Sequence, residues 1–127
     1  MLGYRVDKKS QKQKTYIRGL FAEYLAIVLL SLKGYRIKAH RYKTPVGEVD
    51  IIAQKKDMFV FVEVKARATK TQALESLTPK MKSRIQNAAL HYCAKNKLPD
   101  PSCRFDLITV SRFCTCSHLD NAWMAAA

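Results

Sequence analysis

Apolar residues recur along the chain with two different periods, and the change of period predicts the order of the elements. Between residues 15 and 33 they repeat at helical spacing, and Gly34 follows as a helix stop. This pattern predicts one long helix that is largely buried. A second helix is predicted over residues 78–96, where Thr78 has the character of an N-cap and Pro79 suits the first helical position.

Strands are predicted where the apolar period shortens or where short apolar runs lie between turn residues. The four predicted strands cover residues 35–41, 48–53, 58–66 and 103–110. Residues 54–57 connect the second strand to the third as a hairpin. The tail, residues 111–127, is compatible with either one more strand or a short helix. The order helix, three strands, helix, strand predicts a single mixed α/β domain over residues 1–127.

The composition supports a globular domain that binds a polyanion. A chain of 127 residues with 48% hydrophobic and 26% charged residues is able to bury its own core. The net charge of +13 points to nucleic acid as the partner, although a basic surface that only aids solubility is the simpler alternative. Residues 1–14 are predicted to form a basic, flexible arm that contacts phosphates.

Several other classes of protein are disfavoured by the sequence. The apolar run over residues 20–32 contains Glu23 and is too short to span a membrane, and no A-x-A-like cleavage site follows it. The four cysteines include no CxxC pair, which favours reduced thiols in a cytoplasmic protein. Cys114, Cys116 and His118 lack a common zinc-ligand spacing and are expected to be ordinary strand or loop residues.

Charged residues interrupt the apolar runs of the predicted hairpin. Glu48, Asp50, Glu63 and Lys65 all lie there, and burying a carboxylate is costly unless something pairs with it. If Lys55 and Lys56 form the tip, Asp50 lies opposite Phe61 and diagonal to Glu63. Because side chains alternate along a strand, the three acids and Lys65 then share one face with Phe61.

Carboxylates gathered on one face predict a cation site. Like charges that close repel, so either one carboxylate is protonated or a divalent cation lies between them. Asp and Glu oxygens are the ligands preferred by Mg²⁺ or Mn²⁺. Lys65 would offset charge on a phosphate or orient a water, and Glu23 would add an acid from the first helix. The alternative is that Glu63 and Lys65 form an ordinary ion pair on an exposed face.

These motifs resemble a known superfamily. Glu23, GEVD at 47–50 and EVK at 63–65 are similar to the pattern of the PD-(D/E)XK nucleases. More closely, RG at 18–19, GEVDIIA at 47–53, FVEVKAR at 61–67 and RFDLITV at 104–110 resemble the YraN-like family. The resemblance covers residues 15–123. It implies a restriction-endonuclease-like three-layer core, a mixed central β-sheet flanked by helices, related in fold to archaeal Holliday junction resolvases.

The resemblance also implies residue roles. Asp50 and Glu63, with the carbonyl of Val64, would ligate Mg²⁺, and Lys65 would position or activate the attacking water. Glu23 matches the acid that such nucleases carry on their first helix. Val49 stands where the name-giving proline would be, as in many relatives. Asp106, within RFDLITV, is expected to be structural.

The implied reaction is metal-dependent hydrolysis of DNA phosphodiester bonds. A basic helix would hold the DNA backbone without reading bases, which favours structure-selective cutting in repair or recombination. Its basic residues are Lys80, Lys82 and Arg84. Cutting a branched junction would need two symmetry-related sites and therefore a homodimer. A catalytically inert nucleic-acid-binding protein on the same fold is the alternative, and a peripheral membrane protein is a poorer one.

Overall fold

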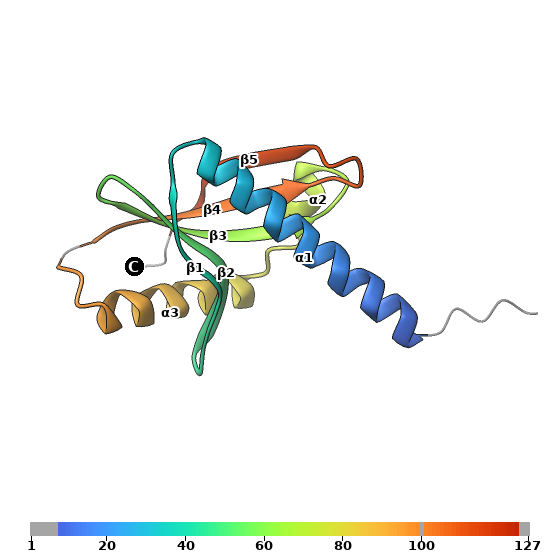
Figure 1. Cartoon of the computed structure of the whole chain (residues 1–127). Helices are drawn as coiled ribbons and strands as arrows, with labels where there is room; N and C mark the ends of the chain where they lie inside the picture. The colour runs from blue at the N-terminus through green and yellow to red at the C-terminus, as the bar shows by residue number, and fades with distance from the viewer. Residues whose placement is uncertain (1–7, 100, 125–127) are drawn as a thin grey trace, which may run out of the picture.

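A computed structural model describes residues 8–99 and 101–124 of the chain (Figure 1). Three helices and five strands make up this part of the molecule. Their bounds are α1 (Lys8–Leu32), β1 (Arg36–Thr44), β2 (Gly47–Lys55), β3 (Met58–Ala66), α2 (Lys70–Glu75), α3 (Pro79–Lys95), β4 (Ser102–Val110) and β5 (Cys116–Trp123).

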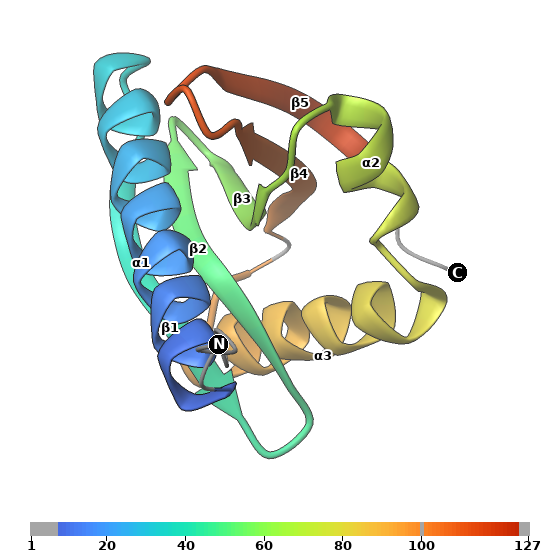
Figure 2. The ribbon, with the colours of Figure 1, turned by 90° about the vertical axis from the view of Figure 1, so that its right-hand side faces the viewer.

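The five strands form one mixed sheet in the order β1-β2-β3-β4-β5. Neighbouring strands are antiparallel except β3 and β4, which are parallel and joined by α2 and α3. Helix α1 lies against one face of the sheet and α3 against the other (Figure 2). The predicted mixed α/β class is confirmed, and β5 shows that the ambiguous tail contains a further strand.

The second predicted helix is confirmed with its ends. The Thr78 hydroxyl accepts a hydrogen bond from the Met81 N–H at 3.1 Å, and Asn96 follows α3 as its C-cap. The short helix α2 was not predicted, because its six residues show no apolar repeat.

Two apolar cores lie on the two faces of the sheet, and β3 contributes to both. Val60, Val62 and Val64 belong to the core beneath α1, whereas Phe59 and Phe61 belong to the core beneath α3. A strand buried on both faces needs an almost continuous apolar sequence, which explains the run that begins at residue 58. The same alternation places Glu63 and Lys65 on the α3 face.

The structure differs from the sequence prediction for α1. The helix begins at Lys8 rather than Thr15, so residues 8–14 of the predicted arm are helical; residues 1–7 lie outside the described part. Its first turns run on beyond the sheet (Figure 1). Within the described part, no helix combines the length and apolarity that crossing a membrane requires.

The prediction that this helix is largely buried was wrong. Its buried apolar stripe is narrow and consists of Ala22, Ala26 and Leu30, spaced four residues apart. Larger apolar residues on the other side of the helix are exposed: Ile17, Phe21, Tyr24, Val28 and Leu32. The small alanines let α1 approach the sheet closely, so only one side of the helix reaches the core.

Asp106 has the structural role that was expected. Its carboxylate is fully buried and accepts two hydrogen bonds of 2.8 Å from Arg104 and one of 3.0 Å from the Asn121 N–H. His118 Nε2 lies 2.7 Å from the same carboxylate. His118 is thereby engaged by Asp106, and within the described residues Cys114, Cys116 and His118 are not gathered into a group that could hold a metal ion.

Gly47, the first residue of β2, lets α3 approach the sheet. A Cβ atom at Gly47 would lie 1.8 Å from the carbonyl oxygen of Arg84, which is backbone and unable to move aside easily. Gly19 in α1 is the opposite case, since a Cβ there would meet nothing within 4 Å.

We therefore expect Gly47→Ala to lower the free energy of unfolding by about 1–3 kcal/mol, because the added methyl group forces β2 and α3 apart. Gly19→Ala is the control and should raise it by about 0.5–1 kcal/mol, since alanine favours a helix interior. Urea denaturation of both variants measures the difference. Equal effects of the two substitutions would contradict the contact between Gly47 and α3.

Candidate active site between β2 and β3

The candidate site lies where β2 and β3 stop pairing. The two strands are paired from Lys55 and Met58, next to the turn, as far as Ile51 and Val62. Beyond that point β2 continues along β1 and β3 continues along β4 (Figure 2). We call this point the fork. The next residues of the two strands are Asp50 and Glu63, so both carboxylates stand at the fork.

The turn of the hairpin differs from the prediction, and the pairing register differs with it. Lys55 pairs with Met58, so the tip is Lys56-Asp57 rather than Lys55-Lys56. Continued to the fork, the observed register brings Asp50 beside Glu63 instead of Phe61. The error is two residues, and an even shift leaves every side chain on the same face. The predicted shared face of Asp50 and Glu63 therefore agrees with the structure.

A hydrogen bond across the fork holds the Asp50 side chain. The Val64 N–H lies beyond the last backbone pair of β2 and β3 and donates instead to the side-chain oxygen Oδ2 of Asp50 at 2.9 Å. A buried backbone N–H needs an acceptor, and here a carboxylate oxygen takes the place of a strand carbonyl. The bond fixes the position of the Asp50 carboxylate at the opening of the sheet.

Asp50 and Glu63 lie within hydrogen-bond reach of each other, and both are poorly solvated. Burial raises the pKa of Glu63 to about 8, and the charge of Asp50 adds to the rise, while Lys65 opposes it. Burial also raises the pKa of Asp50, although its bond from the Val64 N–H lowers it in part. The pair therefore retains a proton at a pH where ordinary carboxyl groups have lost theirs.

Lys65 places an ammonium group beside this pair. Its Nζ lies 3.6 Å from Glu63 Oε1. The alternative reading, an ion pair on an exposed face, is wrong about the environment: the two side chains are only 14% and 13% exposed. One ammonium group thus faces two poorly solvated carboxylates, and its charge lowers the pKa of Glu63 by less than burial and the charge of Asp50 raise it.

Two hollows adjoin Asp50. The smaller, of about 80 Å³, lies between the fork and α3 and has room for several waters; its walls include Glu48, Asp50, Glu63 and Arg84. Of the three basic residues predicted on this helix, Arg84 lines that hollow, whereas Lys80 and Lys82 do not.

The larger hollow, of about 240 Å³, opens on the β1 side of Asp50 and is lined by Arg41, Lys43 and Glu48 as well. Arg41 and Lys43 were not predicted from the sequence as site residues. Pairing residues 36–44 with the GEVD segment across the turn at Pro45 would have found Lys43, since it lies directly opposite Glu48.

Glu23 lies nearby but is already engaged. This carboxylate is buried on α1; its Oε1 is 2.9 Å from His40 Nε2, and it accepts two 3.2 Å hydrogen bonds from Arg41. Its charge is close enough to contribute to the raised pKa of Asp50. Glu23 therefore binds His40 and Arg41 of β1 directly. It influences the fork indirectly, by holding Arg41 and by raising the pKa of Asp50.

The fork offers a cation few side-chain ligands. Within residues 8–99 and 101–124, no group of three or more His, Cys, Asp or Glu side chains is gathered closely enough to hold a metal ion. Asp50 and Glu63 supply two carboxylates. The carbonyl of Val64, expected from the resemblance, is a candidate for a further protein ligand.

Comparison with known sequences identifies relatives along most of the chain. The sequence model described as "Uncharacterised protein family UPF0102" matches residues 22–110. A UPF0102 protein of Chelativorans is 39% identical over 94% of this chain and 97% of its own length. One from Maricaulis maris is 39% identical over 89% and 90%, and one from Paramagnetospirillum magneticum is 43% identical over 84% and 86%. These matches confirm the resemblance to the YraN-like family.

The raised pKa of Glu63 predicts how stability depends on pH without divalent cations. Between the ordinary value of 4.5 and about 8, the folded protein holds a proton that the unfolded chain releases. Stability should therefore fall as pH rises through that window. We expect Glu63→Gln to lose less thermal stability than the native protein between about pH 5 and pH 9, in EDTA.

Glu75→Gln, at an exposed residue of α2, is the matched control and should follow the native protein. Thermal unfolding followed by circular dichroism measures all three proteins. An identical pH dependence in the native, Glu63→Gln and Glu75→Gln proteins would show that Glu63 titrates as an ordinary exposed acid.

Proposed function

We propose that this chain, which belongs to the family UPF0102, is a metal-dependent endonuclease that hydrolyses DNA phosphodiester bonds. The observation that carries the proposal is the fork: two poorly solvated carboxylates side by side, with a lysine against Glu63 and a hollow for several waters in front. The sheet with a helix on each face is compatible with the restriction-endonuclease-like core of the PD-(D/E)XK superfamily, to which we assign the chain.

The residues at the fork suit Mg²⁺ or Mn²⁺. These cations prefer oxygen ligands, and Mg²⁺ keeps several of its waters, so two carboxylates and one carbonyl are sufficient protein ligands. Asp50, Glu63 and the carbonyl of Val64 would hold the ion, and the charge of the poorly solvated pair favours its binding. When bound, the ion supplies charge stabilisation at the phosphate and a lower pKa for a coordinated water.

The chain's own residues then orient the reactants. Lys65, held against Glu63, donates hydrogen bonds to the attacking water or to a phosphate oxygen as negative charge develops there. Asp50 cannot rotate away because the Val64 N–H holds one of its oxygens. Glu23 positions Arg41 at the β1 side of the fork and is a positioning residue in this proposal.

Basic side chains around the fork would hold the DNA backbone. Arg84 lines one hollow beside the carboxylates, and Arg41 and Lys43 line the other. Lys80 and Lys82 would contribute more distant phosphate contacts from α3. Contacts of this kind position DNA without reading its sequence, which favours selection by DNA structure, as in repair or recombination.

A second candidate is a DNA-binding protein of the same fold without useful activity. The engagement of Glu23 by β1 favours it, because that acid is then unavailable as a further ligand. Such a protein would keep the net charge of +13 and its affinity for DNA but would be indifferent to Mg²⁺.

We expect the native protein to cut at least one of a set of end-labelled linear, flapped and four-way DNAs in Mg²⁺ or Mn²⁺, and none in EDTA. Asp50→Asn and Lys65→Met should each lower the cleavage rate about 10²-fold or more, because each removes charge that acts at the reacting phosphate. Asp57→Asn, at the exposed hairpin tip, is the matched control and should cut like the native protein. The rates are measured with enzyme in excess over DNA.

Thermal melting of the same proteins adds a test of the two candidates that is independent of cleavage. In the nuclease, Mg²⁺ raises the melting temperature of the native and Asp57→Asn proteins but not that of Asp50→Asn. DNA binding in EDTA, together with no cleavage in either metal and no Mg²⁺ effect on melting, would support the inert DNA-binding protein instead.

A further inference from the structure

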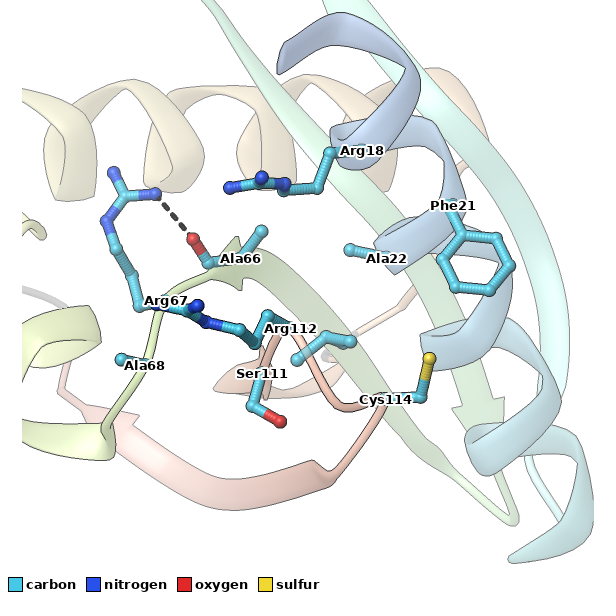
Figure 3. Close-up of a pocket in the computed structure, with 10 residues that line it drawn as sticks. Arg18, Phe21, Ala22, Ala66, Arg67, Ala68, Ser111, Arg112 and Cys114 are labelled. Atoms are coloured by element: carbon cyan, nitrogen blue, oxygen red, sulfur yellow. Dashed lines mark hydrogen bonds between the residues drawn. The ribbon is translucent and has the colours of Figure 1, made fainter. Parts of the chain in front are cut away.

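A third hollow lies on the α1 face of the sheet and is lined by three arginines. Its volume is about 250 Å³. Arg18 reaches it from α1, Arg67 from the residue after β3, and Arg112 from the connection between β4 and β5; Figure 3 shows the three side chains gathered around Ala66. We call this hollow the arginine pocket.

The three guanidinium groups have little negative charge to balance them. In the part of the chain that the structure describes, no carboxylate forms an ion pair with Arg18, Arg67 or Arg112. Arg67 donates to the Ala66 carbonyl at 3.0 Å, and the Arg112 guanidinium lies 5.9 Å from the Phe113 ring. Three cations around one hollow repel one another, and an anion between them would relieve that repulsion.

The chemistry of the pocket favours phosphate as that anion. Guanidinium groups are planar donors that fit phosphate oxygens in pairs, and three of them can surround one phosphate group. Phe21 also lines the pocket and is 52% exposed, so its ring is available to stack against a base. Hydrogen-bond donors for a phosphate and an exposed ring for a base together fit one nucleotide of a DNA strand.

The arginine pocket and the fork lie at the same end of β3. Arg67 follows Lys65 by two residues, which places their backbones roughly 7 Å apart in extended chain. Lys65 faces α3 and Ala66 faces α1, so the two sites lie on opposite faces of one strand end. A nucleic-acid strand passing around this end would meet both.

We propose that the arginine pocket binds a phosphate group of the DNA strand that reaches the fork. This inference rests on the proposed function, because it takes DNA as the ligand. The pocket holds the strand on the α1 face while the carboxylates act on the α3 face. The phosphate is either an internal diester or a phosphate at a strand end, and DNA strands with and without a 5′-phosphate distinguish the two.

The test measures DNA binding in EDTA, where cleavage plays no part. Arg18→Gln combined with Arg112→Gln removes two donors that lie far from the carboxylates in sequence. Arg36→Gln, at the start of β1, makes the same chemical change at an exposed position outside the arginine pocket. The combined Arg18→Gln and Arg36→Gln protein has the same net charge as the test variant and is the matched control. Circular dichroism confirms that all of them fold.

Fluorescence anisotropy with labelled DNA, repeated over a range of salt concentrations, provides the readout. We expect the test variant to bind at least about tenfold more weakly than the native protein. The slope of log affinity against log salt should be about 1 smaller for a duplex, because the removed arginines share one phosphate contact. The charge-matched control should show a smaller change in slope and in affinity, because it retains both Arg67 and Arg112 in the pocket.

Strands with and without a 5′-phosphate identify the source of the phosphate. A loss of affinity seen with both strands indicates an internal diester, and a loss confined to the phosphorylated strand indicates a terminal phosphate. Equal losses in the test variant and the charge-matched control would overturn the proposal, as would a native protein that does not bind DNA. If the arginine effect appears but no metal supports cleavage, the pocket stands and the proposed nuclease function fails.

Discussion

The hydrogen bond from the Val64 N–H to the Asp50 carboxylate is the interaction on which the candidate site depends. A sheet that opens between two strands leaves backbone groups without partners, and leaving a buried N–H unpaired is costly. Asp50 satisfies that N–H with a side-chain oxygen. The carboxylate is thereby fixed beside Glu63, and Lys65 follows one residue beyond Val64 on the same face as Glu63. The feature that lets the sheet open is thus also the one that assembles the site.

Stability and chemistry come from different parts of the sheet. Apolar cores beneath α1 and α3 stabilise the sheet, while the fork keeps two carboxylates poorly solvated at its end. Keeping them so costs stability once both ionise, and natural proteins accept such costs mainly at functional sites. The two carboxylates can attract a cation locally, while the net charge of +13 can attract DNA over longer distances.

Much of the fold could be predicted because local patterns determine it. The bounds of β3 and the caps of α3 match the sequence prediction, since apolar runs and Thr-Pro pairs act locally. The shared face of the acids was predicted correctly although the hairpin tip was not, because strand side chains alternate with a period of two residues and the register error was also two. The burial of α1 was mispredicted because the packing surface is set by Ala22 and Ala26, whose small size carries little weight in a hydrophobic pattern. The arginine pocket joins segments far apart in the chain, and no local pattern relates them.

The most direct test of the central claim, that the fork is built for a divalent cation, is to follow the Glu63 carboxyl carbon by NMR as pH is varied. Without divalent cations, Glu63 should titrate with a pKa of about 8. With saturating Mg²⁺ its pKa should fall below the ordinary value of 4.5, because the cation binds the ionised form. A titration near pH 8 that Mg²⁺ leaves unchanged would contradict the account, because the carboxylate pair would then be no cation site.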